Sequence, residues 1–210
     1  YKYFNKLEFY NIMRSTPTNI HAKNQRKISS LFIINREIQK YASKINLETN
    51  IYNQFFDTED KQIQNNYVTG NYFRSFPILS IAAETPFKIK NFKNNLIYTP
   101  KLKLVISPGF SNSNKLSNED SSISSYTIEN NSYLNRYTGS DKLDNSKRLD
   151  LSLNIKNDIL NGTLWTTYEF TNNSNYHYTQ GNEKKLSDFL GDFNFNNEKY
   201  ETTYNFRFDP

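Results

Sequence analysis

The sequence predicts an all-β protein built around an antiparallel sheet. From Arg148 to Lys156 aliphatic and polar side chains alternate strictly, which is the period of two that an extended strand imposes on its two faces. The 210 residues include 16 Tyr and 16 Phe, which favour strands, and no stretch has the pattern of an amphipathic helix. A mean hydropathy of -0.82 suits a sheet with one wet face and long polar loops. The regular alternation argues against disorder.

Alternation along the chain predicts about nine strands. The first three are expected over residues 3–13, 27–37 and 41–55. Leu7 and Phe9 share one face of the first strand. The second strand has four consecutive apolar residues, from Leu31 to Ile34, so we expect contacts on both of its faces. The third strand returns to clean alternation.

Six further strands are expected over residues 73–87, 96–107, 148–156, 163–170, 187–196 and 200–208. The fourth and fifth strands contain Pro77 and Pro100. Proline has no N–H to donate to a strand ladder, so each is expected at a bulge, an edge or a strand end. The remaining four strands alternate between an apolar, aromatic-rich face and a polar face.

The connections between these strands are expected to alternate in length. Long connections over residues 15–26, 56–72, 108–147 and 171–186 take turns with short ones near residue 39 and over 88–95, 157–162 and 196–199. An antiparallel up-and-down transmembrane β-barrel produces this pattern, because its short turns face the periplasm and its long loops face outside. A soluble Greek-key sandwich does not sort its loops in this way.

We therefore predict a barrel in the outer membrane, with residues 108–147 as a long outer loop. Open sheet edges are unfavourable in lipid, so residues 1–210 are expected to form part of a single larger barrel. The chain begins at Tyr1, and it shows no cleavable leader and no apolar run of about eighteen residues, so we expect either a fragment or a mature segment.

In such a barrel each strand has one face towards lipid and the other towards a polar lumen. The lipid-facing residues are expected to include Leu149, Leu151, Leu153, Ile155, Tyr204, Phe206 and Phe208. The lumen-facing polar residues are expected to be Arg148, Asp150, Asn154, Glu169, Asp192, Asn194, Glu201, Asn205 and Arg207. Aromatic residues near the strand ends fit the girdles at the two membrane interfaces.

The sequence offers little that could perform catalysis. His21 and His177 have no second imidazole or cysteine nearby and are expected to be solvated, and the six glycines stand singly instead of forming a phosphate loop. Oxygen ligands for Ca²⁺ could come from Glu119, Asp120, Asp141 and Asp144, but their spacing differs from the calcium-loop template. We expect a hydrogen-bonded loop there, with no enzymatic activity, cofactor or metal.

Charge and cysteine content exclude further classes of protein. The net charge of +5 is modest, and the basic residues are scattered through loops and alternate strand positions, so nucleic-acid binding is not expected. Without cysteine, the segment can form neither a disulfide nor a thiolate metal site.

The polar segments 118–121 and 135–142 resemble the N-E-D-S and N-R-F-S-G-x-D-R patterns in the barrel domain of the LptD family, which assembles lipopolysaccharide in the Gram-negative outer membrane. The matching residues are Asn118, Glu119, Asp120, Ser121, Asn135, Arg136, Gly139, Asp141 and Lys142. Segments 74–77, 85–87, 99–100 and 186–209 also resemble family patterns in the same order. Lys142 stands where the family has Arg, which removes any bidentate contact at that position.

The resemblance implies a large barrel that delivers lipopolysaccharide to the outer leaflet through a lateral opening. It implies three partners: lipopolysaccharide, an LptE-like plug lipoprotein, and periplasmic Lpt bridge proteins that would contact parts outside this segment. Two alternatives remain open on the residues alone. One is another outer-membrane barrel, such as a porin or a TonB-dependent receptor, and the other is a soluble carbohydrate-binding β-domain.

Overall fold

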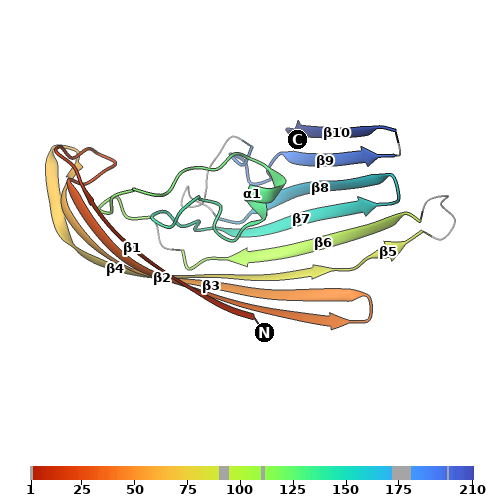
Figure 1. Cartoon of the computed structure of the whole chain (residues 1–210), viewed down its shortest axis with the longest axis horizontal. Helices are drawn as coiled ribbons and strands as arrows, with labels where there is room; N and C mark the ends of the chain where they lie inside the picture. Colours follow the sequence, from red (N-terminus) through yellow and green to blue (C-terminus); the bar gives the residue numbers. More distant parts are fainter. Residues whose placement is uncertain (1, 90–94, 110–111, 172–180, 198) are drawn as a thin grey trace.

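The computed structural model describes residues 2–89, 95–109, 112–171, 181–197 and 199–210 (Figure 1). Across these residues the strands form one antiparallel sheet of ten strands. Its elements are β1 (Lys2–Met13), β2 (Asn24–Lys40), β3 (Ser43–Ile63), β4 (Asn66–Glu84), β5 (Phe87–Lys88), β6 (Ile97–Ile106), α1 (Ile128–Ser132), β7 (Lys147–Lys156), β8 (Leu160–Glu169), β9 (Phe189–Asn196) and β10 (Glu201–Phe208).

The strands follow one another through the sheet in chain order. The sheet order is β1-β2-β3-β4-β6-β7-β8-β9-β10, and the short β5 pairs with β6 beside this path. This arrangement confirms the predicted all-β, antiparallel, sequentially connected fold. Among the described residues the sheet is not closed, because β1 and β10 do not pair with each other. Figure 1 shows a curved sheet with the β6–β7 connection and α1 lying over one face.

None of the helices in the described part of the chain is both long and apolar enough to cross a membrane.

The predicted long loop over residues 56–72 is wrong, because both neighbouring strands continue through it. β3 extends to Ile63, β4 begins at Asn66, and a tight turn with Gln64 at φ +56° joins them. A bulge between Thr58 and Lys61 shifts the register within this hairpin. Polar side chains on both faces hid the strand signal here. The expected strict alternation of loop lengths therefore fails at this connection.

Both prolines lie where a ladder is interrupted, as predicted. β4 pairs with β6 only from Leu79 to Glu84, so at Pro77 the strand is paired on the β3 side alone among the described residues. Pro100 pairs with β7, but on its other side it lies between the β4 pairing, which ends at Lys101, and the β5 pairing, which begins at Tyr98. A missing backbone donor is tolerated at such positions.

The register assigns each side chain to one of two faces, because residues paired directly across antiparallel strands point to the same side. We call the face covered by the β6–β7 connection the inner face and the opposite one the outer face. One outer row runs through Leu47, Ile81, Leu104, Leu149 and Tyr168, which are partners on five successive strands of the sheet.

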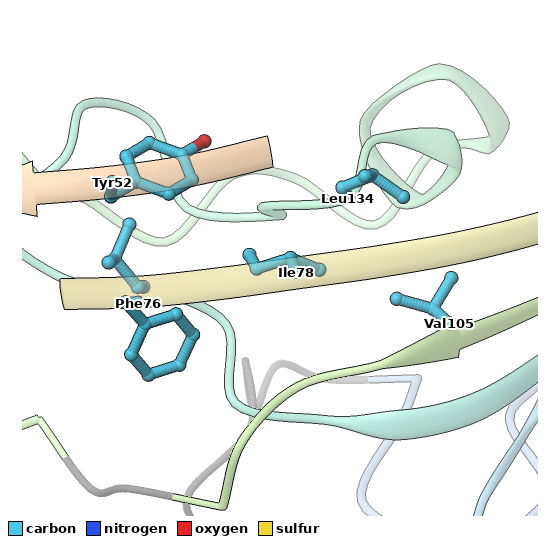
Figure 2. Packing of buried hydrophobic residues seen from close by; sticks show 6 residues of the cluster. Tyr52, Phe76, Ile78, Val105 and Leu134 are labelled. Atoms are coloured by element: carbon cyan, nitrogen blue, oxygen red, sulfur yellow. The ribbon is translucent and has the colours of Figure 1, made fainter. Parts of the chain in front are cut away.

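A small apolar core lies between the inner face and the β6–β7 connection. It consists of Tyr52, Phe76, Ile78, Val105, Leu134 and Leu143. Figure 2 shows Leu134 on the connection, with Ile78 on β4 and Val105 on β6. Leu31 packs against this cluster, whereas Phe32, its neighbour on the outer face, is exposed. The apolar run of β2 is therefore contacted by the chain on the inner side.

Candidate functional site

The β6–β7 connection, residues 107–146, folds back over the inner face of the sheet (Figure 1). We call it the inner loop; residues 110 and 111 lie outside its described part. Several strand side chains bind its backbone, among them Gln54 and Arg74. Gln54 of β3 donates to the carbonyl oxygen of Ser140 at 2.9 Å, and Arg74 of β4 donates to the carbonyls of Ser140 and Asp141, both at 2.9 Å. Carbonyl groups buried by the contact thus keep hydrogen-bond partners.

The two family-like segments of the inner loop meet through reciprocal carboxylate contacts. Oδ1 of Asp120 accepts the backbone N–H groups of Ser140 at 3.0 Å and Asp141 at 2.7 Å. Oδ2 of Asp141 accepts the backbone N–H groups of Glu119 at 2.6 Å and Asp120 at 3.0 Å. We call this arrangement the Asp120–Asp141 junction. Charge-assisted bonds of this kind are roughly twice as strong as neutral ones.

Lys27 of β2 attaches the junction to the sheet. Its ammonium group donates to Oδ2 of Asp120 at 3.0 Å, Oγ of Ser140 at 2.7 Å and Oδ1 of Asp141 at 2.6 Å. An ammonium group has three N–H donors, so all of them are used. The Lys27 and Asp141 side chains are 1% and 0% exposed. Removing Lys27 would leave the buried carboxylate of Asp141 without its cation, which is strongly destabilising.

The N-terminal hairpin makes further contacts with the junction. The Tyr10 hydroxyl donates to both carboxylate oxygens of Asp141, at 3.0 and 3.1 Å. The buried carboxylate of Glu119 pairs with Arg14, and Oγ of Ser117 accepts the backbone N–H of Ala22 at 2.8 Å. The inner loop therefore holds β1, β2, β3 and β4 together through polar contacts.

Gly139 allows the two segments to approach each other. Its φ of +73° lies in the left-handed region that side chains disfavour. A Cβ atom at this position would lie 2.3 Å from the carbonyl oxygen of Asp120 and 2.6 Å from its Oδ1. The glycine of the motif is thus required by both the backbone conformation and the closeness of Asp120.

The surroundings of Asp120 stabilise its ionised form. Burial alone would raise the pKa of this carboxyl group, but the positive charge of Lys27 and the backbone hydrogen bond from Asp141 lower the pKa to about 2. The side chain is 31% exposed, so solvent screens part of this effect. Asp120 therefore remains charged well below neutral pH.

A second ionic cluster lies under the inner loop, over β7 and β8. Arg136 Nε and Nη2 bind the carboxylate of Asp144 at 2.5 and 3.2 Å, and Nη2 lies 3.4 Å from Glu169. Burial would lower the pKa of Arg136, but the Asp144 carboxylate raises it above its usual value. This arginine of the motif is therefore a charged anchor for the loop.

Arg148 completes the second cluster from the sheet side. Its Nη1 group lies 3.1 Å from Asp144 and donates to Oγ of Ser146 at 2.7 Å, while Nε lies 3.1 Å from Asp150. Its Nη2 group donates to the carbonyl of Tyr133 at 2.7 Å. Asp144 thus bridges two buried arginines, Arg136 from the loop and Arg148 from β7.

The structure brings some of the predicted polar residues together and separates others. All nine lie on the inner face by register: Arg148, Asp150, Asn154, Glu169, Asp192, Asn194, Glu201, Asn205 and Arg207. Arg148, Asp150 and Glu169 are buried under the inner loop. Arg207 pairs with Asp188 and lies over the Tyr126 ring. Asn194 and Glu201 bond to each other nearer the opposite strand ends, at 3.3 Å.

The register places the seven predicted lipid-facing residues together on the outer face: Leu149, Leu151, Leu153, Ile155, Tyr204, Phe206 and Phe208. Tyr204 and Phe208 are strongly exposed, and the four aliphatic residues are half-buried by their neighbours. The polar and apolar sets therefore occupy opposite faces of the sheet.

The remaining motif residues bond mainly within the loop, and Asn135 also forms a side-chain hydrogen bond with Tyr52 of β3. Asn118 accepts the backbone N–H of Ser121 and donates to its carbonyl, at 3.1 and 2.7 Å. The Ser121 hydroxyl oxygen accepts the N–H of Lys142 at 2.8 Å. Asn135 accepts the N–H of Asp144 at 2.9 Å, next to the second cluster.

Sequence reasoning missed the strand residues that receive the inner loop, namely Tyr10, Lys27, Gln54 and Arg74. Alternation placed Lys27 in a strand and opposite in face to Ile28, but it could not indicate a partner 114 positions away. The sequence signal that could have indicated this contact was Lys27 itself, a basic residue on the inner face of β2, a strand with mostly uncharged side chains.

The acidic residues considered for Ca²⁺ are neutralised by basic side chains. Asp120 and Asp141 bind Lys27, Asp144 binds Arg136 and Arg148, and Glu119 binds Arg14. Within the described ranges, no group of three or more His, Cys, Asp and Glu residues could hold a metal ion. His21 lies 3.4 Å from Glu119, and His177 lies outside the described residues.

No protein-family model matches the chain, and no curated protein matches it significantly.

Replacing Gly139 with Ala should detach the inner loop, because the new Cβ would collide with the Asp120 backbone. We expect a loss of about 3 kcal/mol or more and faster protease cleavage within residues 118–142. Gly109→Ala is the matched control, since Gly109 has φ +94° but open space around it and should lose only about 1 kcal/mol. Equal cleavage of the two variants would contradict the close contact.

Acidification should release the junction between pH 4 and pH 2. The pKa of Asp120 is lower in the folded state, so its stabilisation is complete above the ordinary carboxyl pKa and disappears as pH falls through about 2. We expect a contribution of about 1–2 kcal/mol. An environment-sensitive dye on Lys115→Cys, in a chain without native cysteine, reports this release. Asp120→Asn should lack the acid transition; if it keeps the transition, another group is responsible.

Proposed function

We propose that this chain is a segment of the wall of an outer-membrane β-barrel that passes lipopolysaccharide to the outer leaflet. The observation that carries the proposal is the division of one continuous sheet into an apolar outer face and a polar inner face that binds its own long loop. In a soluble antiparallel sheet the face that contacts water is normally polar. In this sheet the uncovered face is the apolar one.

The outer face supports a membrane position because its apolar side chains form a band, which we call the apolar band, and this band ends at a row of polar side chains. Phe9, Ile28, Phe55 and Phe73 form one row across β1 to β4. The next row towards the β1–β2 connection is polar and contains Asn11, Arg26, Asp57 and Asn71, with Arg26 and Asp57 paired at 3.3 Å. An aromatic row followed by a charged row is typical of a membrane–water interface.

The width of the band supports the same position. On β3 the band runs from Ile45 to Phe55, close to the 9–11 residues of a tilted transmembrane strand. Within it, Ser75 donates to Asn53 at 2.7 Å, so these polar side chains satisfy each other. Arg36 lies near the opposite border, where a long basic side chain can reach the interface.

The sheet edges support membership of a larger barrel. In the described chain, β1 pairs only with β2 and β10 only with β9, so each has one unpaired edge. In lipid an unsatisfied backbone group costs several kcal/mol, so further strands would have to pair with both edges.

The resemblance to the LptD family selects lipopolysaccharide among possible cargoes. The inner loop that carries most of the resemblance is also bonded to the inner face of the sheet through Lys27, Gln54 and Arg74. The polar inner face would pass the saccharide, while the lipid chains follow an apolar path. In this proposal the partners are lipopolysaccharide, an LptE-like plug and the periplasmic Lpt bridge. Transport needs no covalent step.

The two faces should respond oppositely to an added charge. Leu151→Lys places a charge in the outer apolar row and should cost about 2–4 kcal/mol in a bilayer. Asn154→Lys, on the inner face of the same strand, should be tolerated. The amount of folded protein in the outer-membrane fraction measures the difference. Equal amounts of the two variants, or a protein that stays soluble without detergent, would favour a soluble β-domain.

Depletion of the protein in its host tests the transport step. We expect less lipopolysaccharide at the cell surface, measured by surface labelling of intact cells, and recovery when the native protein is supplied again. A porin or a TonB-dependent receptor would leave surface lipopolysaccharide unchanged, so that result would overturn the proposed cargo.

A further inference from the structure

A cavity of about 340 Å³ lies beside the Asp120–Asp141 junction. It is bounded by the β1–β2 connection, the end of β3 and the two family-like segments of the inner loop. Its lining includes Asn19, Lys61, Asn114, Leu116, Tyr137 and Lys142. It is therefore large enough for one small solute. Along β3 it lies at the level of Lys61, past Phe55, where the apolar band of the outer face ends.

Two ammonium groups in the lining, those of Lys61 and Lys142, have no carboxylate partner within the described part of the chain. Lys61 is 4% exposed and donates to the carbonyl oxygens of Leu116 at 2.7 Å and Ile20 at 3.3 Å, which are neutral acceptors. These bonds leave one of its three N–H groups available. No hydrogen bond or ion pair with the Lys142 ammonium group occurs among the described residues.

The one acidic residue in the lining is already neutralised. Asp141 binds Lys27, the Tyr10 hydroxyl and two backbone N–H groups. The cavity therefore contains an excess of positive charge, carried by Lys61 and Lys142. Burial and the charge of Lys142 lower the pKa of Lys61, and the carboxylate of Glu119, which pairs with Arg14, opposes this shift only in part. A bound anion would relieve the repulsion between the two ammonium groups.

The rest of the lining suits a sugar. Asn19, Ser113 and Asn114 offer amide and hydroxyl groups for sugar hydroxyls, and Leu116 and Tyr137 supply apolar surface. We propose that this cavity binds a phosphorylated saccharide, with its phosphate between Lys61 and Lys142 and its hydroxyls at the Asn and Ser side chains. A phosphate monoester carries about −1.5 to −2 charges at neutral pH, which matches two ammonium groups. The choice of a saccharide rests on the proposed function, whereas the choice of phosphate rests on the charges.

Calorimetric titration of the intact, detergent-solubilised protein tests this site with glucose 6-phosphate, glucose and inorganic phosphate. We expect glucose 6-phosphate to bind at least about tenfold more tightly than either of the other two, because only it engages both halves of the cavity. Equal binding of glucose would exclude the phosphate site. Equal binding of inorganic phosphate would exclude the saccharide contacts.

Lys142→Met is the informative variant, because this side chain carries no structural bond among the described residues and its loss should not unfold the loop. It should weaken glucose 6-phosphate binding by about tenfold. Lys115→Met removes an exposed lysine of the same loop that does not line the cavity, and should bind as the native protein does. Unchanged binding by Lys142→Met would overturn the proposal.

The binding assay and the depletion experiment can fail separately. Sugar-phosphate binding that depends on Lys142 would stand even if depletion left surface lipopolysaccharide unchanged. Conversely, loss of surface lipopolysaccharide with no binding in this cavity would leave the transport proposal in place and remove the site.

Discussion

The buried ammonium group of Lys27 is the interaction on which the inner face depends. It lies between Asp120 and Asp141, and all three of its donors are used there. A buried charge without a partner is strongly unfavourable, so strand β2 and the inner loop each need the other. The reciprocal carboxylate contacts of the junction depend in turn on this charge, because Lys27 offsets the two carboxylates that are brought together.

Polar contacts matter so much here because the apolar core under the loop is small. Six residues form that core, and two of them, Leu134 and Leu143, belong to the loop. The second ionic cluster, in which Asp144 bridges Arg136 and Arg148, supplies a further attachment. Because these contacts join the loop to several strands of the sheet, they give the loop one defined position over the inner face. In the proposed barrel it would narrow the polar path and form one side of the cavity with Lys61 and Lys142.

The fold was predictable where one face of a strand is apolar and the other polar. β7 was anticipated within one residue at its start, because Leu149, Leu151, Leu153 and Ile155 alternate with polar residues. The hairpin between β3 and β4 was missed because its far half is polar on both faces, which removes the period of two. The Asp120–Asp141 contact was not predictable either. Alternation gives the face of Lys27 but not its partner, and the resemblance identified the loop motif but not the strand residues that bind it.

Hydrogen–deuterium exchange at the junction measures most directly whether Lys27 holds the inner loop on the sheet. We expect slow exchange of the backbone amides of Glu119, Asp120, Ser140 and Asp141 in the native protein, because each donates to a carboxylate. We also expect faster exchange of all four amides in Lys27→Met, with the amides of β7 unchanged. Rapid exchange of these four amides in the native protein, or equal exchange in native and Lys27→Met proteins, would show that Lys27 does not hold the junction.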